Sequence, residues 1–186
     1  MNPDVSARRR ILRALVILLI VTIAPAHAFD FFHRTPDWPA LKQSVRERHP
    51  SVPQLTTAQL RAWLADESRP QPLLLDARAS AEYEVSHLKN ARLAPDLAAA
   101  LRTLEGRPKD APIVVYCSVG VRSSALAEKL IGAGYRNIHD LEGSIFEWAN
   151  LGYPVYRGAS PATKVHPYDS NWGKLLEPRL RAEPTS

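Results

Sequence analysis

The chain contains a single cysteine, Cys117, in the stretch IVVYCSVGVRSS at residues 113–124. An apolar run typical of a buried strand ends directly before it, and a helical pattern begins a few residues after it. A loop that joins a strand to the start of a helix has backbone N–H groups without partners, and the helix dipole adds partial positive charge. Such a loop favours a thiolate, which is the nucleophilic form of cysteine. The pattern therefore predicts that Cys117 is a catalytic nucleophile, against the more common reading of a lone cysteine after an apolar strand as a core residue.

The residues after Cys117 are suited to holding a small substrate. Gly120 can adopt the positive φ that curls such a loop, and Arg122 can place a fixed positive charge over it. Ser123 or Ser124 can cap the following helix or donate a hydrogen bond. The predicted substrate-binding loop consists of Ser118, Val119, Gly120, Val121, Arg122 and Ser123.

The first 28 residues have the pattern of a secretory signal peptide. Four arginines between Arg8 and Arg13 precede thirteen uncharged residues, and Ala26-His27-Ala28 fits a cleavage site. Thirteen residues are too few to span a bilayer, which takes about 20. The sequence therefore predicts cleavage near Ala28 and a periplasmic or secreted protein, with membrane contact only if the segment stays uncleaved.

Composition excludes several other classes of protein. The formal net charge is +5, but the signal segment contributes much of it, so no basic stripe remains for a nucleic acid. One cysteine cannot form an internal disulfide or a cysteine-based zinc site, and the six histidines have no ligand spacing. We expect no metal and no diffusible cofactor.

Strand and helix patterns alternate along the centre of the chain. Residues 29–54 are expected to form an extension with a short helix capped by Asp37. Strands are expected at 73–75, 91–93, 113–116 and 137–141, and helices at 57–64, 80–84, 97–104, 123–131 and 145–151, with Thr57 and Ser80 as two of the caps. This alternation predicts an α/β fold with a mostly parallel central sheet and helices on both faces. Ligands bind beyond the carboxyl ends of strands in such folds, which is where Cys117 stands.

Three separated motifs resemble the rhodanese-like sulfurtransferase family. The segment from Cys117 to Ser123 is similar to the active loop of that family, with Gly120 and Arg122 at matching positions. The stretch LEGSIFEWANLGYPV is similar to the C-terminal motif of the family. The upstream signature is matched by Asp76, Arg78, Glu82, Tyr83, His87 and Ala91. The resemblance covers residues 55–156, and we expect a rhodanese-like domain there.

The resemblance implies a ping-pong transfer of sulfane sulfur through a persulfide on Cys117. The donor would be thiosulfate, a persulfide or a polysulfide, and the acceptor a thiol, a cyanide-like molecule or a protein. Asp76, Arg78 and His87 would support the site without reacting. Ser118 and Val119 stand where many thiosulfate-using members have a basic residue, which favours a persulfide or polysulfide donor. Ser144 replaces a glycine of the family and is expected to affect the scaffold more than the chemistry. A monomer is expected.

Rival functions remain open from the sequence. The domain is also found as a non-catalytic binding module, and the same thiol suits a redox or sulfide sensor. Cysteine phosphatases and arsenate reductases rank lower, because their loops carry one residue more between cysteine and arginine than the Cys-x4-Arg spacing here. Residues 157–186 form a proline-punctuated tail with apolar residues that include Tyr168 and Trp172. We expect its middle to pack on the domain, where it could shape access to Cys117.

Overall fold

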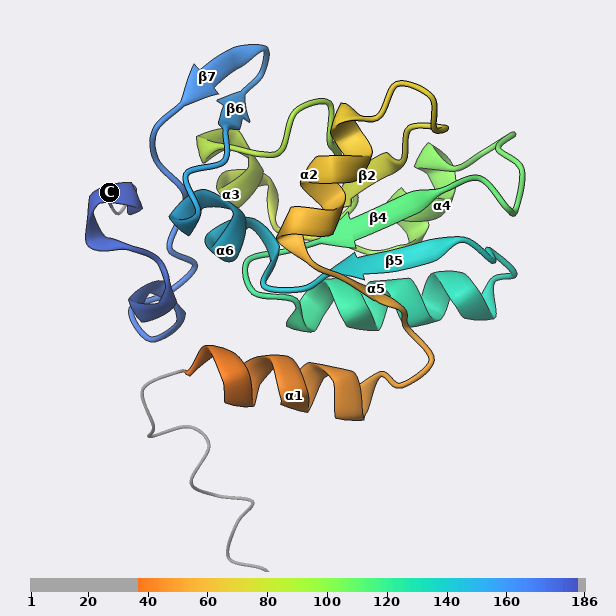
Figure 1. Ribbon diagram of the computed structural model, residues 1–186, viewed down its shortest axis with the longest axis horizontal. Coiled ribbons are helices and arrows are strands. Elements are labelled where there is room, and N and C mark those ends of the chain that lie inside the picture. Colours follow the sequence, from red (N-terminus) through yellow and green to blue (C-terminus); the bar gives the residue numbers. More distant parts are fainter. Residues whose placement is uncertain (1–36, 184–186) are drawn as a thin grey trace, which may run out of the picture. The chain divides into compact units, whose positions relative to one another are not determined.

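The computed structural model describes residues 37–183 (Figure 1). The predicted signal peptide lies outside the described residues. None of the helices within 37–183 is long and apolar enough to cross a membrane.

Helices and strands alternate along most of the described chain. The strands are β1 (Gln54–Leu55), β2 (Leu73–Asp76), β3 (Arg92–Leu93), β4 (Ile113–Tyr116), β5 (Ile138–Leu141), β6 (Val155–Arg157) and β7 (Ser160–Ala162). The helices are α1 (Trp38–Arg48), α2 (Thr57–Ala65), α3 (Ser80–Val85), α4 (Leu97–Thr103), α5 (Val121–Gly132) and α6 (Ser144–Asn150), followed by the 3₁₀ turns η3 (Trp172–Leu175) and η4 (Pro178–Leu180).

The central sheet has five parallel strands in the order β1-β5-β4-β2-β3. Strand β4 occupies the middle, and all four of its residues are buried. Parallel neighbours require crossover connections, which the helices between the strands supply. This architecture confirms the predicted α/β fold with a parallel sheet.

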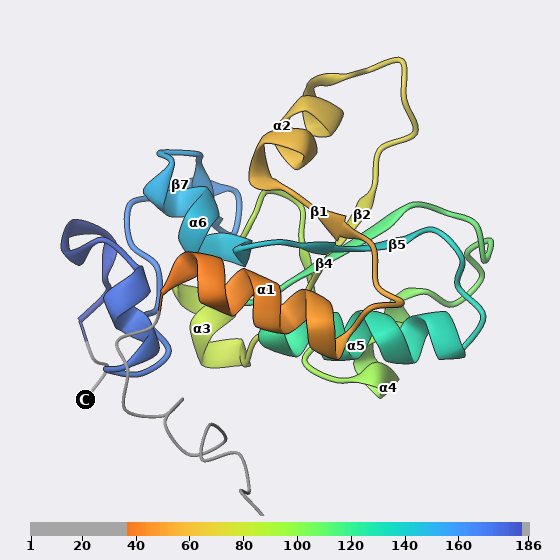
Figure 2. The same ribbon diagram turned by 60° about the horizontal axis from the view of Figure 1, so that its bottom comes forward.

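Side chains of β4 alternate between two hydrophobic layers. Val114 and Tyr116 pack with Leu60 and Trp63 of α2, whereas Ile113 and Val115 belong to the layer that contains α4 and α5. Figures 1 and 2 show α2 on one side of the sheet and α4 and α5 on the other. A strand buried on both faces needs apolar residues at every position, which explains the unbroken apolar run before Cys117.

Three local expectations were wrong by small margins. The N-cap of α2 is Thr56, whose hydroxyl accepts the N–H of Gln59 in a capping box, so Thr57 is the first helical residue. Ala79, not Ser80, precedes α3. The last helix was expected to reach residue 151, but α6 ends at Asn150, and Leu151 follows it and is 53% exposed.

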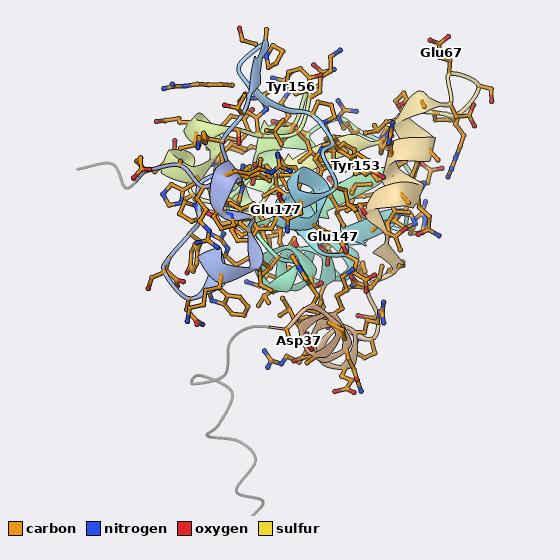
Figure 3. The ribbon with its side chains drawn as sticks, turned by 60° about the vertical axis from the view of Figure 1, so that its left-hand side comes forward. Asp37, Glu67, Glu147, Tyr153, Tyr156 and Glu177 are labelled. Carbon is orange, nitrogen blue, oxygen red and sulfur yellow. The ribbon has the colours of Figure 1, made fainter. Side chains whose placement is uncertain are left out.

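Helix α1 and the tail both pack beside α6. Lys42 on α1 donates to Glu147 on α6 at 2.5 Å, and Asn150 donates to the carbonyl of Leu175 in the tail at 2.8 Å. Figure 3 labels Glu147 on α6, Glu177 in the tail and Asp37 at the start of α1. The tail also places Leu176 in the same hydrophobic cluster as Leu41 of α1. The middle of the tail therefore packs on the domain.

Candidate active site

Cys117 lies directly after the central strand β4 and before α5. Gly120 is the N-cap of that helix and has a φ of 106°, which a residue with a side chain adopts only with strain. A Cβ added at Gly120 would approach Asp140 Oδ2 only to 3.5 Å, so the backbone conformation, not space, requires glycine. The N–H of Gly120 donates to Cys117 Sγ at 3.2 Å. The thiol is therefore held inside a loop that curls around it.

The backbone of the loop is tied to the start of α6. The N–H of Cys117 donates to Ser144 Oγ at 3.0 Å, and the Ser144 hydroxyl donates to the carbonyl of Leu141, also at 3.0 Å. The N–H groups of Ile145 and Phe146 donate to the carbonyls of Cys117 and Ser118 at 3.2 and 3.1 Å. Ser144 therefore acts on the scaffold of the site, because its hydroxyl binds the backbone of the candidate nucleophile.

Arg122 is paired with a carboxylate. Its guanidinium donates to both oxygens of Glu82 at 2.7 and 2.8 Å and to Ser118 Oγ at 2.9 Å. Glu82 also accepts the hydroxyl of Ser118 and the N–H of Ala79, at 2.9 and 3.0 Å. Burial alone would raise the pKa of Glu82, but the bonds from Arg122, Ala79 and Ser118 outweigh it and lower that pKa.

This pairing changes the electrostatics expected from the sequence. Arg122 was expected to place a fixed positive charge over the loop, and the structure adds that Glu82, only 3% exposed, pairs with this charge. Glu82 was not among the predicted site residues. The glutamate-aromatic pair Glu82-Tyr83 in the upstream motif was the available signal for it.

Asp76 and Arg78 support the loop from a distance. Both are fully buried, and Arg78 donates to Asp76 Oδ1 and Oδ2 at 2.9 and 2.7 Å. Arg78 also donates to the carbonyl of Ser86 at 2.6 Å, on the far side of α3. The pair thus fixes both ends of the segment that carries Glu82. The pair is linked to the loop through α3, whose Glu82 binds Arg122.

His87 is held in place by hydrogen bonds to backbone groups. Its Nε2 accepts the N–H of Gly158 at 3.1 Å, so Nδ1 carries the proton and donates to the carbonyl of Leu88 at 2.8 Å. The ring stacks on Tyr83 with centroids 4.2 Å apart. His87 therefore anchors the β6–β7 hairpin, and these bonds give it no proton to exchange with Cys117.

The two serines at the start of α5 face inward. Ser124 Oγ donates to Asp140 Oδ2 at 2.7 Å, and Ser123 is fully buried. Neither caps α5, because the helix begins earlier, at Val121. Burial raises the pKa of Asp140 to about 8, against the opposing effect of the bond from Ser124. A protonated carboxyl therefore lies behind the loop near neutral pH.

A hollow of about 100 Å³ opens above the thiol. Its walls combine the loop with two aromatic residues of the tail. They are formed by Cys117, Ser118, Val119, Val121, Arg122, Tyr168 and Trp172. The structure thus brings the predicted nucleophile together with Arg122, while Gly120 and Ser123 lie in its supporting backbone. Tyr168 and Trp172 were not predicted as site residues, although the sequence analysis noted their apolar character in the tail.

The described residues contain no group of three histidine, cysteine, aspartate or glutamate side chains that could hold a metal ion. The chemistry available at this site is that of a thiol inside a loop of backbone N–H groups. The N–H groups of the first turn of α5 have no acceptor within the helix, so they can stabilise an anionic sulfur.

The rhodanese-like domain model matches residues 56–151, which is just over half of the chain. The chain belongs to the rhodanese-like domain family. This rhodanese-like chain is 36% identical over 101 residues to a tRNA uridine(34) hydroxylase of Erwinia tasmaniensis, covering 51% of this chain and 28% of that one. It is 33% identical over 101 residues to the probable adenylyltransferase/sulfurtransferase MoeZ of Mycobacterium tuberculosis, covering 54% and 25%.

Solved structures show the same fold. A thiosulfate sulfurtransferase from Pseudomonas aeruginosa superposes with a TM-score of 0.55 at 22% identity, covering 66% of this rhodanese-like chain and 24% of that chain. A rhodanese-like domain from Anabaena superposes with a TM-score of 0.52 at 24% identity, covering 57% and 80%. The chain spans about a quarter of the length of the curated relatives described above. The family match ends before Tyr168 and Trp172.

Proposed function

We propose that this protein is a sulfurtransferase that carries sulfane sulfur as a persulfide on Cys117. The observation that carries the proposal is the position of Cys117, which lines a hollow and whose Sγ accepts the N–H of Gly120 inside a loop at the start of α5. Membership of the rhodanese-like family and a relative named as a sulfurtransferase support it.

The reaction is a pair of sulfur-sulfur exchanges. The Cys117 thiolate attacks the outer sulfur of a persulfide donor, forming a new S–S bond while the S–S bond of the donor breaks. The leaving thiolate takes the electron pair and is released. An acceptor thiolate then attacks the outer sulfur of the Cys117 persulfide, which restores the Cys117 thiolate. No net oxidation occurs, so the cycle needs no cofactor.

The loop residues contribute by stabilising charge on sulfur. The N–H of Gly120 already donates to Cys117 Sγ, and the N–H groups of the first turn of α5, which have no acceptor within the helix, can bind the developing anion. Ser144 holds the backbone of Cys117, and Glu82 holds Arg122 and Ser118 at the rim. His87 needs no part in proton transfer, because a thiolate is a good leaving group near neutral pH.

A phosphatase or arsenate reductase is less well supported. Those reactions require the loop to hold a tetrahedral oxyanion, for which a free guanidinium is the natural partner. Here both Arg122 amino groups are bonded to Glu82, and the hollow measures about 100 Å³. Two other candidates remain, a binding module and a redox or sulfide sensor, and both contain the same buried thiol. Only a sulfurtransferase would pass sulfur to an acceptor over repeated cycles, so a turnover assay distinguishes it from them.

Intact-mass measurement of the purified protein tests the proposal. Incubation with a small persulfide donor such as hydrogen disulfide should add one sulfur atom that cyanide then removes, and thiosulfate, tested in parallel, should add it more slowly. The Cys117→Ser variant should gain none. If no donor adds sulfur to a protein whose Cys117 is reduced and reacts with a small alkylating reagent, the proposal is wrong and a binding module is favoured.

The proposal also concerns where the protein acts. The signal pattern at residues 1–28 supports cleavage near Ala28 and a periplasmic or secreted sulfurtransferase with small-molecule partners. The N-terminal residue of the protein isolated from its native cells tests this. An N-terminus at Phe29 is the expected result, and an intact Met1 would contradict it.

A further inference from the structure

The hollow above Cys117 is completed by residues that lie far along the chain from the loop. Tyr168 and Trp172 belong to the tail, beyond the end of the family match at residue 151. Removing them would leave the other five lining residues, all of which belong to the loop or the start of α5. The tail therefore decides how much space lies over the thiol.

The space is small and its walls are largely apolar. Its volume of about 100 Å³ is well below the roughly 300–1,000 Å³ of pockets that hold drug-sized ligands. Val119, Val121 and the two aromatic rings provide apolar surface, and Cys117 itself is only 1% exposed. Such a hollow can accommodate a few heavy atoms bonded to the reacting sulfur, but not a peptide-sized group.

The charge around the hollow is balanced. Arg122 is the cationic residue of the lining, and Glu82 neutralises it through two hydrogen bonds. The Arg122 guanidinium also lies over the ring of Tyr168, 4.6 Å from its centroid. A dianionic donor would be repelled by the Cys117 thiolate, because no unpaired cation lies beside the thiolate to offset the repulsion. A donor with little charge avoids this repulsion.

The tail segment that carries the two rings is fixed at both ends. The N–H of Val165 donates to the carbonyl of Leu180 at 2.7 Å, and Ala182 returns a bond to Val165 at 2.9 Å. After the rings, Leu175 and Leu176 are buried in the core cluster that includes α6. The rings are therefore mounted on a segment anchored before and after them.

The segment between these anchors forms a turn that is held by hydrogen bonds and close packing among its own residues. Asp169 Oδ1 accepts the N–H groups of Asn171 and Trp172 at 2.9 and 2.8 Å. A Cβ added at Gly173 would lie 3.0 Å from the Cβ of Pro167, so glycine lets the two ends of the turn approach each other. Tyr168 has a φ of 66°, a conformation that a residue with a large side chain rarely adopts and that structures keep where surrounding contacts enforce it.

We propose that Tyr168 and Trp172 are the specificity-determining residues of this site. They form a cap over Cys117 that admits short, weakly charged persulfides and hydrogen polysulfides and excludes glutathione persulfide and macromolecular acceptors. The inference rests on the proposed sulfur transfer and names its substrate class. The cap acts by size, while the Glu82–Arg122 pair acts by charge.

The test compares full-length wild type with Trp172→Ala and Tyr168→Ala. The rate at which Cys117 gains one sulfur atom is measured by intact mass with hydrogen disulfide and with glutathione persulfide. Each cap variant should accelerate the reaction with glutathione persulfide by about tenfold or more, while the rate with hydrogen disulfide changes by less than about threefold. Tyr156→Ala is the matched control, because Tyr156 lies in β6 and does not line the hollow.

A second readout does not depend on sulfur transfer. Because Cys117 is the only cysteine of the chain, its alkylation by iodoacetamide and by a bulky maleimide can be followed by mass alone. The cap variants should raise the maleimide rate relative to the iodoacetamide rate. Trp172→Leu keeps much of the apolar volume and replaces Trp172→Ala if the latter fails to fold.

Two results separate the failure of this inference from failure of the proposed function. If sulfur is transferred but the ratio of large-donor to small-donor rates is the same in wild type and both cap variants, the cap is wrong and the sulfurtransferase stands. If no donor adds sulfur while the alkylation ratio shifts as expected, the cap is present and the proposed function is wrong. Equal alkylation ratios in all variants overturn the cap directly.

Discussion

The Glu82–Arg122 pair offers a sharp test of the site, through the variant Glu82→Gln. Glu82 is 3% exposed and accepts four hydrogen bonds, two of them from Arg122. The glutamine amide has nearly the same shape as the carboxylate but carries no negative charge. Its NH₂ group is a donor, so it cannot accept the hydrogen bonds that one carboxylate oxygen of Glu82 accepted. The change therefore isolates the charge of one side chain.

The expected loss of stability follows from the exposure of the two partners. Removing one member of a fully buried ion pair destabilises a protein by about 3–5 kcal/mol. The side chain of Arg122 is 34% exposed, so water takes over part of its interaction, and we expect a loss of about 2 kcal/mol. For a chain of this size that is a decrease in melting temperature of roughly 4–8 °C.

The assay is urea unfolding of wild type, Glu82→Gln and the control Glu84→Gln. Glu84 lies on the same helix, is exposed and bonds only to Ser80 in the described contacts, so its change should alter stability by less than about 0.5 kcal/mol. Because the pKa of Glu82 is lowered in the folded state, its contribution is present above the pKa of the unfolded chain and is lost as the pH falls below it. The difference between wild type and Glu82→Gln should therefore shrink at acidic pH.

The same variant tests the electrostatic account of donor choice. Freeing the charge of Arg122 beside the thiol should raise the rate with thiosulfate by about tenfold, or about 1.4 kcal/mol, relative to hydrogen disulfide. Equal stability of Glu82→Gln and Glu84→Gln would refute the reasoning about the pair. An unchanged ratio of donor rates in a folded Glu82→Gln would refute its role in excluding anionic donors.

Three further outcomes are expected. Since the pKa of Asp140 is raised to about 8, the folded protein holds a proton there that the unfolded chain releases near pH 4. The free energy of unfolding should therefore fall as the pH rises between these values, by up to about 1.4 kcal/mol per pH unit. Asp140→Asn should lower that slope in urea titrations at pH 5 and pH 7.5, and an unaltered slope would contradict the prediction. Ser144→Ala leaves the buried N–H of Cys117 without its acceptor and should destabilise by about 1–3 kcal/mol in thermal unfolding, whereas a neutral effect would mean that another acceptor replaces it. Leu176→Ala removes a fully buried side chain of the tail and should destabilise by about 2–5 kcal/mol; a loss below 1 kcal/mol would show that the tail is not part of the cooperative core.

Local patterns in the sequence were enough to predict much of the fold. Period-2 and period-3.6 patterns are short-range properties, so the strand before Cys117 and the helix after it were visible, and their alternation implied a parallel sheet. The cap of α2 was also readable from the sequence. Thr56 and Thr57 are both competent caps, but Thr56 has Gln59 three residues later and forms a capping box with it.

The sequence by itself determined that one cysteine stands between a strand and a helix, followed by a glycine able to take a positive φ. Only the tertiary structure decided what surrounds the thiol. Glu82 reaches Arg122 across 40 positions, and Ser144 reaches Cys117 across 27. Tyr168 and Trp172 arrive from a tail whose course no local pattern specifies. Such contacts depend on how separate elements pack in space, and that packing sets the charge and the size of the site.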